Sequence, residues 1–307
     1  MVTGEHRVDS WPSLPLDAWL DTQETRHLWT QVAGKVKLAL TPFLNEWWNV
    51  ALTVTPRGLT TGSIPSGHGS FAIDFDFIDH QLYVRDSDGL TRSVSLVPKS
   101  VAAFHEEVMA TLREMGIAVT INPLPAEIPD AIRFDLDIEH ASYDAEAVER
   151  WWWIQARTEQ IMQQYRSSFV GKSSPVCFYW GSFDLNTTRF SGRPTTPPAG
   201  APHFLQLAES QENFSSGFWP GNISMSGVTL GEPAFYAYVY PEPEGFRHAT
   251  ILSGAARYDE RFGQFLLPYA DVARTADPDK TVLAFFKDAY EAAVMLADWD
   301  RSALERS

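Results

Sequence analysis

The sequence is poor in cysteine. Its 307 residues include a single one, Cys177, so no disulfide can form within the chain, and we expect a cytoplasmic protein kept in a reducing environment. There is also no run of about 18 apolar residues and no apolar segment near the start. We therefore expect neither a membrane-spanning helix nor a secretory signal.

Positive charge is scarce as well. The chain has 24 Lys and Arg residues against 39 Asp and Glu residues, which gives a formal net charge of -15 at pH 7. Such an acidic chain repels phosphate backbones, so a nucleic acid is not an expected partner. We attribute the acidity to solubility rather than to an acidic binding surface.

Signatures of common catalytic and cofactor sites are missing. The stretch "TTGSIPSGHGS" (residues 60–70) has the glycines of a phosphate loop, but no helical pattern follows it, so the match to a dinucleotide site is weak. The sequence contains no serine nucleophile elbow, no CxxC pair and no kinase signature. We therefore expect no organic cofactor.

Apolar and aromatic residues are plentiful. Hydrophobic residues make up 44% of the chain and aromatic residues 13%, with 11 tryptophans. This composition is typical of a globular protein that buries a large amount of ring surface. The length suits one large core or two modest domains.

Apolar residues recur at helical spacing in four segments. A four-residue repeat from Leu28 to Leu40 predicts a helix that begins after Asp21 and that Pro42 ends. The last predicted helix begins at Asp277-Pro278, an N-cap followed by proline in the first turn. In all, helices are expected at 21–41, 100–116, 144–169 and from 277 onwards.

Alternating apolar and polar residues predict antiparallel strands between these helices. Residues 47–57 are expected to form a strand in which Trp47, Asn49 and Arg57 point to one face. A hairpin turn is expected at Asp88-Gly89, and residues 117–122 are expected to form a further strand.

The two halves of the chain follow a similar order. "EWWNVALTVTPRG" aligns with "FYWGSFDLNTTRF", which sets Trp48 against Trp180 and Arg57 against Arg189. We expect an α+β fold of two pseudo-repeated halves, each an antiparallel sheet of about four strands flanked by helices, packed as one body. A pocket is expected where the two sheets meet.

The expected organisation follows from this repeat. It comprises an N-terminal arm (1–20), a first α+β half (21–122), a Pro-rich connector (123–143) and a second α+β half with a long linking helix (144–307).

Several blocks lie along nearly the whole chain: "HLWTQVAGKVKLAL", "WGSFDLNTTRFSGR", "GFWPG" and "PAFYAYVYPEPEGF". Together they resemble a bacterial family of conserved cytoplasmic proteins of unknown function. The resemblance supplies no established activity.

The resemblance does imply a set of departures. Histidine is usual in the family where this chain has Glu46, Asn49, Cys177 and Glu212, and glutamate is usual where it has Asn213. Imidazoles with a carboxylate are the ligand set of a transition metal, so residue type implies a metal site in the family. A change at all five positions indicates that the chemistry of this site differs from that of the family. We favour loss of the metal over its replacement by another metal.

Three further candidates have open interpretations. Arg57 and Arg189 are expected to point inward, where each either pairs with a carboxylate or holds an anionic substrate group. Cys177 lies among apolar neighbours and is either a buried, inert thiol or a nucleophile.

The preferred hypothesis is an enzyme that acts on a small anionic organic molecule by acid–base chemistry, through isomerisation, cyclisation or elimination in a specialised bacterial pathway. The expected catalytic residues are Glu46, Glu212 and Cys177, and the expected substrate-binding residues are Asn49, Arg57, Arg189, Asn213, Trp47 and Tyr179.

Two other hypotheses remain open. In one, Glu46, Cys177 and Glu212 bind a first-row transition metal that assists the reaction. In the other, the chamber binds a small molecule without catalysis. The sequence does not indicate the oligomeric state.

Overall fold

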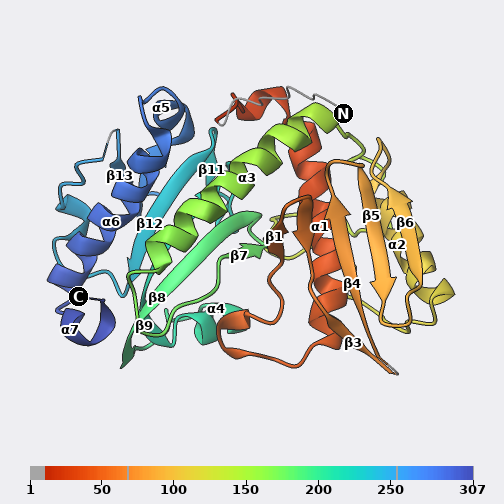
Figure 1. Ribbon diagram of the computed structural model, residues 1–307, viewed down its shortest axis with the longest axis horizontal. Coiled ribbons are helices and arrows are strands. Elements are labelled where there is room, and N and C mark those ends of the chain that lie inside the picture. Colours follow the sequence, from red (N-terminus) through yellow and green to blue (C-terminus); the bar gives the residue numbers. More distant parts are fainter. Residues whose placement is uncertain (1–10, 68, 254, 307) are drawn as a thin grey trace, which may run out of the picture.

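Two antiparallel sheets of six strands each form the frame of the protein (Figure 1). The computed structural model describes residues 11–67, 69–253 and 255–306. Helices lie before and after each sheet along the chain, so the fold is α+β, as the sequence predicts. The sheets have six strands rather than the expected four or so.

The first half runs from helix α1 to helix α2. Its sheet has the order β1-β2-β4-β5-β6, with β3 paired to β4. The elements are α1 (Leu20–Leu40), β1 (Thr53–Thr55), β2 (Gly58–Thr60), β3 (Ile64–Ser66), β4 (Gly69–Asp76), β5 (Gln81–Asp86), β6 (Thr91–Ser95) and α2 (Val101–Glu114).

The second half begins with the long helix α3. Its sheet has the order β13-β14-β12-β9-β8-β7, and β10 and β11 form a separate small hairpin. The elements are α3 (Ala145–Arg166), β7 (Cys177–Tyr179), β8 (Asp184–Pro194), α4 (His203–Ala208), β9 (Gln211–Trp219), β10 (Asn222–Ile223), β11 (Thr229–Leu230), β12 (Ala234–Tyr240), β13 (Arg257–Asp259), β14 (Gln264–Pro268), α5 (Tyr269–Ala273), α6 (Pro278–Leu296) and α7 (Arg301–Leu304). Short 3-10 turns occur at Leu16–Ala18, Asn45–Trp47 and Phe246–His248.

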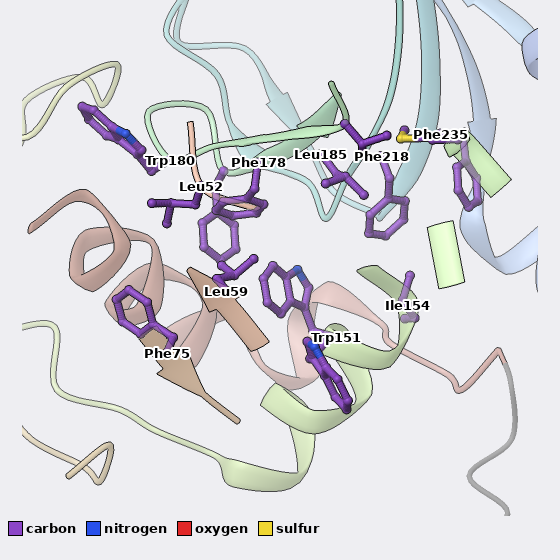
Figure 2. Close-up of a cluster of buried hydrophobic side chains, with 14 of the residues drawn as sticks. Leu52, Leu59, Phe75, Trp151, Ile154, Phe178, Trp180, Leu185, Phe218 and Phe235 are labelled. Carbon is purple, nitrogen blue, oxygen red and sulfur yellow. The ribbon is translucent and has the colours of Figure 1, made fainter. Parts of the chain in front are cut away.

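The two sheets meet edge to edge at a backbone bridge between Leu52 and Phe178 (Figure 1). The N–H of Leu52 donates to the carbonyl of Phe178 at 2.9 Å, and the N–H of Phe178 donates back at 2.8 Å. Trp151 of α3 packs edge-on against Phe178 at 5.7 Å between ring centroids. Figure 2 shows these residues beside Leu59 of the first sheet, within one apolar core that spans both halves.

Helix α1 is buried on nearly every side between its ends. Besides apolar residues such as Trp29 and Val32, it buries the polar residues His27, Gln31 and Lys35. Buried polar groups are costly without hydrogen bonds, so these side chains need partners from the surrounding chain. They find them at the candidate site described below.

Most helix predictions are confirmed. Ser100, Asp144 and Asp277 each accept a hydrogen bond from a backbone N–H in the first turn of the helix that follows, as N-caps do. The first helix begins earlier than expected, at Leu20, so Asp21 is not its cap. The hairpin turn at Asp88-Gly89 is confirmed, since β5 and β6 pair on either side of it.

Two strand predictions are wrong. Residues 117–122 form no strand. Of the expected strand 47–57, only Thr53–Thr55 forms a strand, extended by the bridge at Leu52, because the residues before Leu52 turn. Asn49 stabilises this turn: its side chain accepts from the N–H of Leu44 at 3.1 Å and donates to the hydroxyl of Thr41 at 3.1 Å.

The order of helices and strands is similar in the two halves, but this similarity does not establish a duplication, which stays a prediction.

The connector 123–143 contains no helix and no strand. None of the helices in the described part of the chain has the length and apolarity that crossing a lipid bilayer requires.

A close contact between α1 and the second half gives a stability prediction. A Cβ atom added at Gly34 would overlap the indole ring of Trp180. We expect Gly34→Ala to lower the free energy of unfolding by about 1 to 3 kcal/mol, although alanine favours a helix more than glycine does. Urea unfolding measures the change.

Gly231→Ala is the control, because no atom lies within 4 Å of a Cβ built there. It should leave stability nearly unchanged. A Gly34→Ala variant at least as stable as the wild type would contradict the close packing of Trp180 on α1.

Candidate functional site

A cavity of about 490 Å³ lies where the two halves meet. Its walls come from the end of α1, the 3-10 turn at Asn45–Trp47, the connector, the loop after β7, helix α4 and one face of the second sheet. The volume is in the range of pockets that hold a small organic molecule.

The floor of the cavity is one face of strands β8, β9 and β12. Side chains alternate along a strand, so every second residue points into the cavity. The floor residues are Asp184, Asn186, Thr188 and Phe190 of β8, Asn213 and Ser215 of β9, and Tyr236 and Tyr238 of β12.

Polar side chains on this floor form a continuous hydrogen-bond network. Asp184 accepts from the hydroxyls of Ser182 and Tyr236. The Tyr236 oxygen in turn accepts from the amide nitrogen of Asn186 at 2.8 Å. Thr188 donates to the amide oxygen of Asn186 at 2.9 Å, which fixes the orientation of that side chain.

The connector supplies Glu127, whose position helix α1 fixes. The side chain of Gln31 accepts from the N–H of Ala126 at 2.7 Å and donates to its carbonyl at 2.9 Å. Lys35 donates to the carbonyl of Leu124 at 2.7 Å. These three bonds fix the chain at Leu124 and Ala126, directly before Glu127, whose side chain lines the cavity.

The carboxyl of Glu127 lies against Gly181. A Cβ atom at position 181 would overlap this carboxyl, so only glycine leaves room for it. His27 of α1 holds the glycine in place, since its Nε2 donates to the Gly181 carbonyl at 2.8 Å. Burial lowers the pKa of His27 to about 4, so the ring is neutral at pH 7.

Glu127 has a strained backbone and an unpaired side chain. Its φ angle is +60°, which is uncommon for a residue other than glycine. Among the described residues, none forms a hydrogen bond or ion pair with its carboxyl. Burial, with a further contribution from the charge of Asp184, raises the pKa of Glu127 to about 7.

Two other carboxyls share this environment. Burial raises the pKa of Asp184, while the bonds from Ser182 and Tyr236 oppose the shift. Burial also raises the pKa of Glu209, which accepts from the amide nitrogen of Asn213 at 2.6 Å.

Glu46 is the fourth carboxyl of the cavity, and among these four it alone has a cationic partner within the described residues. Its Oε1 accepts from Nζ of Lys172 at 2.7 Å. No lysine or arginine is among the residues that line the cavity in the described part of the chain.

Eight aromatic side chains complete the walls. They are Trp47, Trp48, Tyr179, Trp180, Phe190, Phe204, Tyr236 and Tyr238. Glu46 and Trp47 reach the cavity through positive φ angles of 50° and 60°, in a turn that Asn49 stabilises. The indole N–H of Trp47 donates to the Phe204 carbonyl at 2.9 Å, which ties α4 to this turn.

Comparison with protein families assigns the chain. A family of unknown function, DUF5996, matches residues 11–306. The chain belongs to the DUF5996 family. No curated protein and no solved structure matches it.

Four of the nine expected site residues line the cavity of this DUF5996 chain: Glu46, Trp47, Tyr179 and Asn213. Asn49 is buried in the turn that carries Glu46, where its side chain accepts a hydrogen bond from the backbone N–H of Leu44. Glu212 points to the opposite face of β9 from Asn213 and pairs with Arg193 at 2.7 Å. The structure therefore brings together only part of the expected set.

Neither arginine lines the cavity, and only Arg189 points inward. Arg57 is half-exposed and pairs with Asp76 and Asp79, because the strand that carries it is shorter than expected. Arg189 is buried on the opposite face of β8 from the cavity. There its guanidinium donates to the backbone carbonyl of Tyr165 at 2.5 Å. The guanidinium carbon also lies 3.6 Å from the centroid of the Tyr165 ring.

Cys177 is buried and does not line the cavity. Burial raises the pKa of its thiol to about 11, so roughly one molecule in ten thousand carries the thiolate at pH 7. Within the described ranges, no three His, Cys, Asp or Glu side chains could together hold a metal ion. Glu46, Cys177 and Glu212 are thus not assembled as a ligand set.

Sequence reasoning missed Glu127, Asp184, Glu209 and Tyr236. Tyr236 and Tyr238 carry a usable signal, since tyrosines alternate along "AFYAYVY" and mark one face of a strand. Glu127 carries none, because it lies in an irregular segment whose path depends on contacts with α1.

The raised pKa of Glu127 predicts a pH-dependent effect on stability. An acid with a pKa of about 7 when folded and 4.5 as its ordinary value favours unfolding increasingly as pH rises between these values. Glu127→Gln removes this charge. We expect it to increase the free energy of unfolding by on the order of 3 kcal/mol above pH 7, and by little below pH 4.5.

Urea unfolding of wild type and variant on both sides of this pH range tests the effect. Glu212→Gln is the matched control, since it removes the same charge outside the cavity and should give no comparable increase. An equal effect of Glu127→Gln at both ends of the range would show that Glu127 has an ordinary pKa.

Proposed function

We propose that this chain is an enzyme that moves protons to and from a small organic molecule bound in the cavity, with Glu127 as the acid–base group. One observation carries the proposal: a carboxyl with no partner among the described residues is held against Gly181 in an aromatic cavity, where burial raises its pKa to about 7. A pKa near the working pH is the value that serves general acid–base catalysis best.

The cost of this arrangement supports a catalytic role. A positive φ angle and an uncompensated carboxyl both destabilise the fold, and such features persist where function requires them. A structural carboxylate at this depth would be expected to have a cationic partner, as Glu46 does in Lys172.

Glu127 can act in both directions. As the acid, its O–H bond breaks and the proton passes to a substrate atom. As the base, its ionised carboxylate takes a proton from a C–H, N–H or O–H group of the substrate. A step that returns the proton elsewhere on the molecule is an isomerisation, and a step that also expels a leaving group is an elimination. Neither needs a cofactor.

The other cavity residues have supporting roles in this proposal. Asp184 remains fixed by Ser182 and Tyr236, and its charge raises the proton affinity of Glu127. Asn186 and Asn213 present amide groups that can orient a polar substrate. The aromatic walls exclude water, which strengthens electrostatic interactions within the cavity.

The roles expected for Glu46 and Glu212 change accordingly. Glu46 reaches the cavity, but its carboxylate is occupied by Lys172 and by the side-chain amide of Asn45. Glu212 is outside. With Arg57 and Arg189 elsewhere, no lysine or arginine of the described residues lines the cavity to bind an anionic substrate.

The test is a hydrogen-exchange screen in D₂O. Wild type, Glu127→Gln and Glu212→Gln proteins are incubated with a panel of small amines, ketones and heterocycles, and proton NMR follows deuterium incorporation and product formation. We expect Glu127→Gln to slow the reaction of any substrate by about 10² to 10⁴-fold while binding persists. Glu212→Gln should match the wild type.

Turnover by Glu127→Gln at the wild-type rate would remove Glu127 from the mechanism. Saturable binding of panel compounds with neither exchange nor product would favour the alternative of a non-catalytic binding protein.

A further inference from the structure

Negative groups dominate the polar lining of the cavity. Glu46, Glu127, Asp184 and Glu209 all contribute carboxyls, whereas no lysine or arginine lines it in the described residues. Lys172 compensates the charge of Glu46 and not that of the other three carboxyls. Its ammonium group also donates a hydrogen bond to the Gln211 side chain at 3.5 Å. Three carboxyls therefore line the cavity without a positive partner among the described residues.

The walls around these carboxyls suit a positive group. Trp47, Trp48 and Trp180 line the cavity together with three tyrosines. The face of an aromatic ring is electron-rich and attracts ammonium groups, most strongly in tryptophan, and rings that surround such a group are the usual site for quaternary ammonium ligands.

Lys172 illustrates how this wall accommodates an ammonium group. Its Nζ lies 4.6 Å from the ring centroid of Phe190 and 5.5 Å from that of Trp48, while it also pairs with Glu46. Both rings line the cavity. At the other end of the cavity, Glu127 and Trp180 supply a carboxyl and an aromatic ring, and no lysine or arginine of the described residues lines it.

Anions and cations thus meet opposite conditions here. An anionic ligand would approach four carboxyls, and the two arginines that could have held it lie on other faces of the protein. A cationic ligand would compensate Glu127 and Asp184, which interact with one another through their charges. It would also rest against the ring of Trp180, which adjoins Gly181.

We propose that the ligand of this cavity is a small organic cation, an amine or quaternary ammonium compound, whose positive group lies between Glu127, Asp184 and the aromatic wall. This inference rests on the proposed function in taking the cavity as the substrate site, and it adds the charge class of the substrate.

Three probes of matched shape and different charge test it: choline, its neutral carbon analogue 3,3-dimethylbutan-1-ol, and the anion 3,3-dimethylbutanoate. Binding is measured by tryptophan fluorescence and confirmed by calorimetry at low salt. At about pH 8, where Glu127 is ionised, we expect choline to bind at least about tenfold more tightly than the alcohol, and the anion to bind most weakly.

The variants locate the positive group. Glu127→Gln should weaken choline binding at about pH 8 to the level of the wild type at about pH 5.5, and should leave the alcohol unaffected. Glu212→Gln, which removes the same charge outside the cavity, should bind all three probes as the wild type does.

Equal affinity for choline and the alcohol, or no choline binding up to about 50 mM, would overturn the inference. So would choline binding that Glu127→Gln leaves unchanged. These outcomes are separate from the proton-transfer test. If the wild type shows no preference for choline over the alcohol while Glu127→Gln is inactive, the catalytic proposal still stands. Conversely, a Glu127→Gln enzyme that keeps the wild-type turnover but loses the cation preference would overturn only the catalytic proposal.

Discussion

The contact between the Glu127 carboxyl and Gly181 depends on one face of helix α1. His27 holds the Gly181 carbonyl, Gln31 pairs with both backbone groups of Ala126, and Gly34 makes room for the neighbouring Trp180. Buried polar side chains would destabilise a central helix if they lacked partners. Here the backbones of the connector and the β7 loop supply those partners, so the same bonds stabilise the fold and position the site.

The surroundings of the site offset its unfavourable features. Glu46, Trp47 and Glu127 have positive φ angles, and three of the four cavity carboxyls have no cationic partner in the described part of the chain. Such local costs are tolerable because the apolar core spans both halves and holds the walls of the cavity in place. A cationic ligand would remove part of this cost on binding.

Local patterns in the sequence were sufficient for the helices, whose caps at Ser100, Asp144 and Asp277 are set by neighbouring residues. They were not sufficient for the faces of the strands. The turn between β7 and β8 pairs Cys177 with Asn186, so Arg189, at odd spacing from Asn186, lies on the opposite face of the sheet from the cavity. Two of the positions expected to depart from the family pattern, Glu46 and Asn213, do line the cavity. Glu127 could not be found in this way, because tertiary contacts alone determine its position.

The central claim is that the cavity holds an acid–base carboxyl active near neutral pH. NMR titration of the Glu127 side-chain carboxyl carbon in ¹³C-glutamate-labelled protein, assigned by comparison with Glu127→Gln, measures its pKa directly. A midpoint near 7 is the predicted result. A midpoint near the ordinary value of 4.5 would contradict the account, because Glu127 would then be permanently ionised at neutral pH.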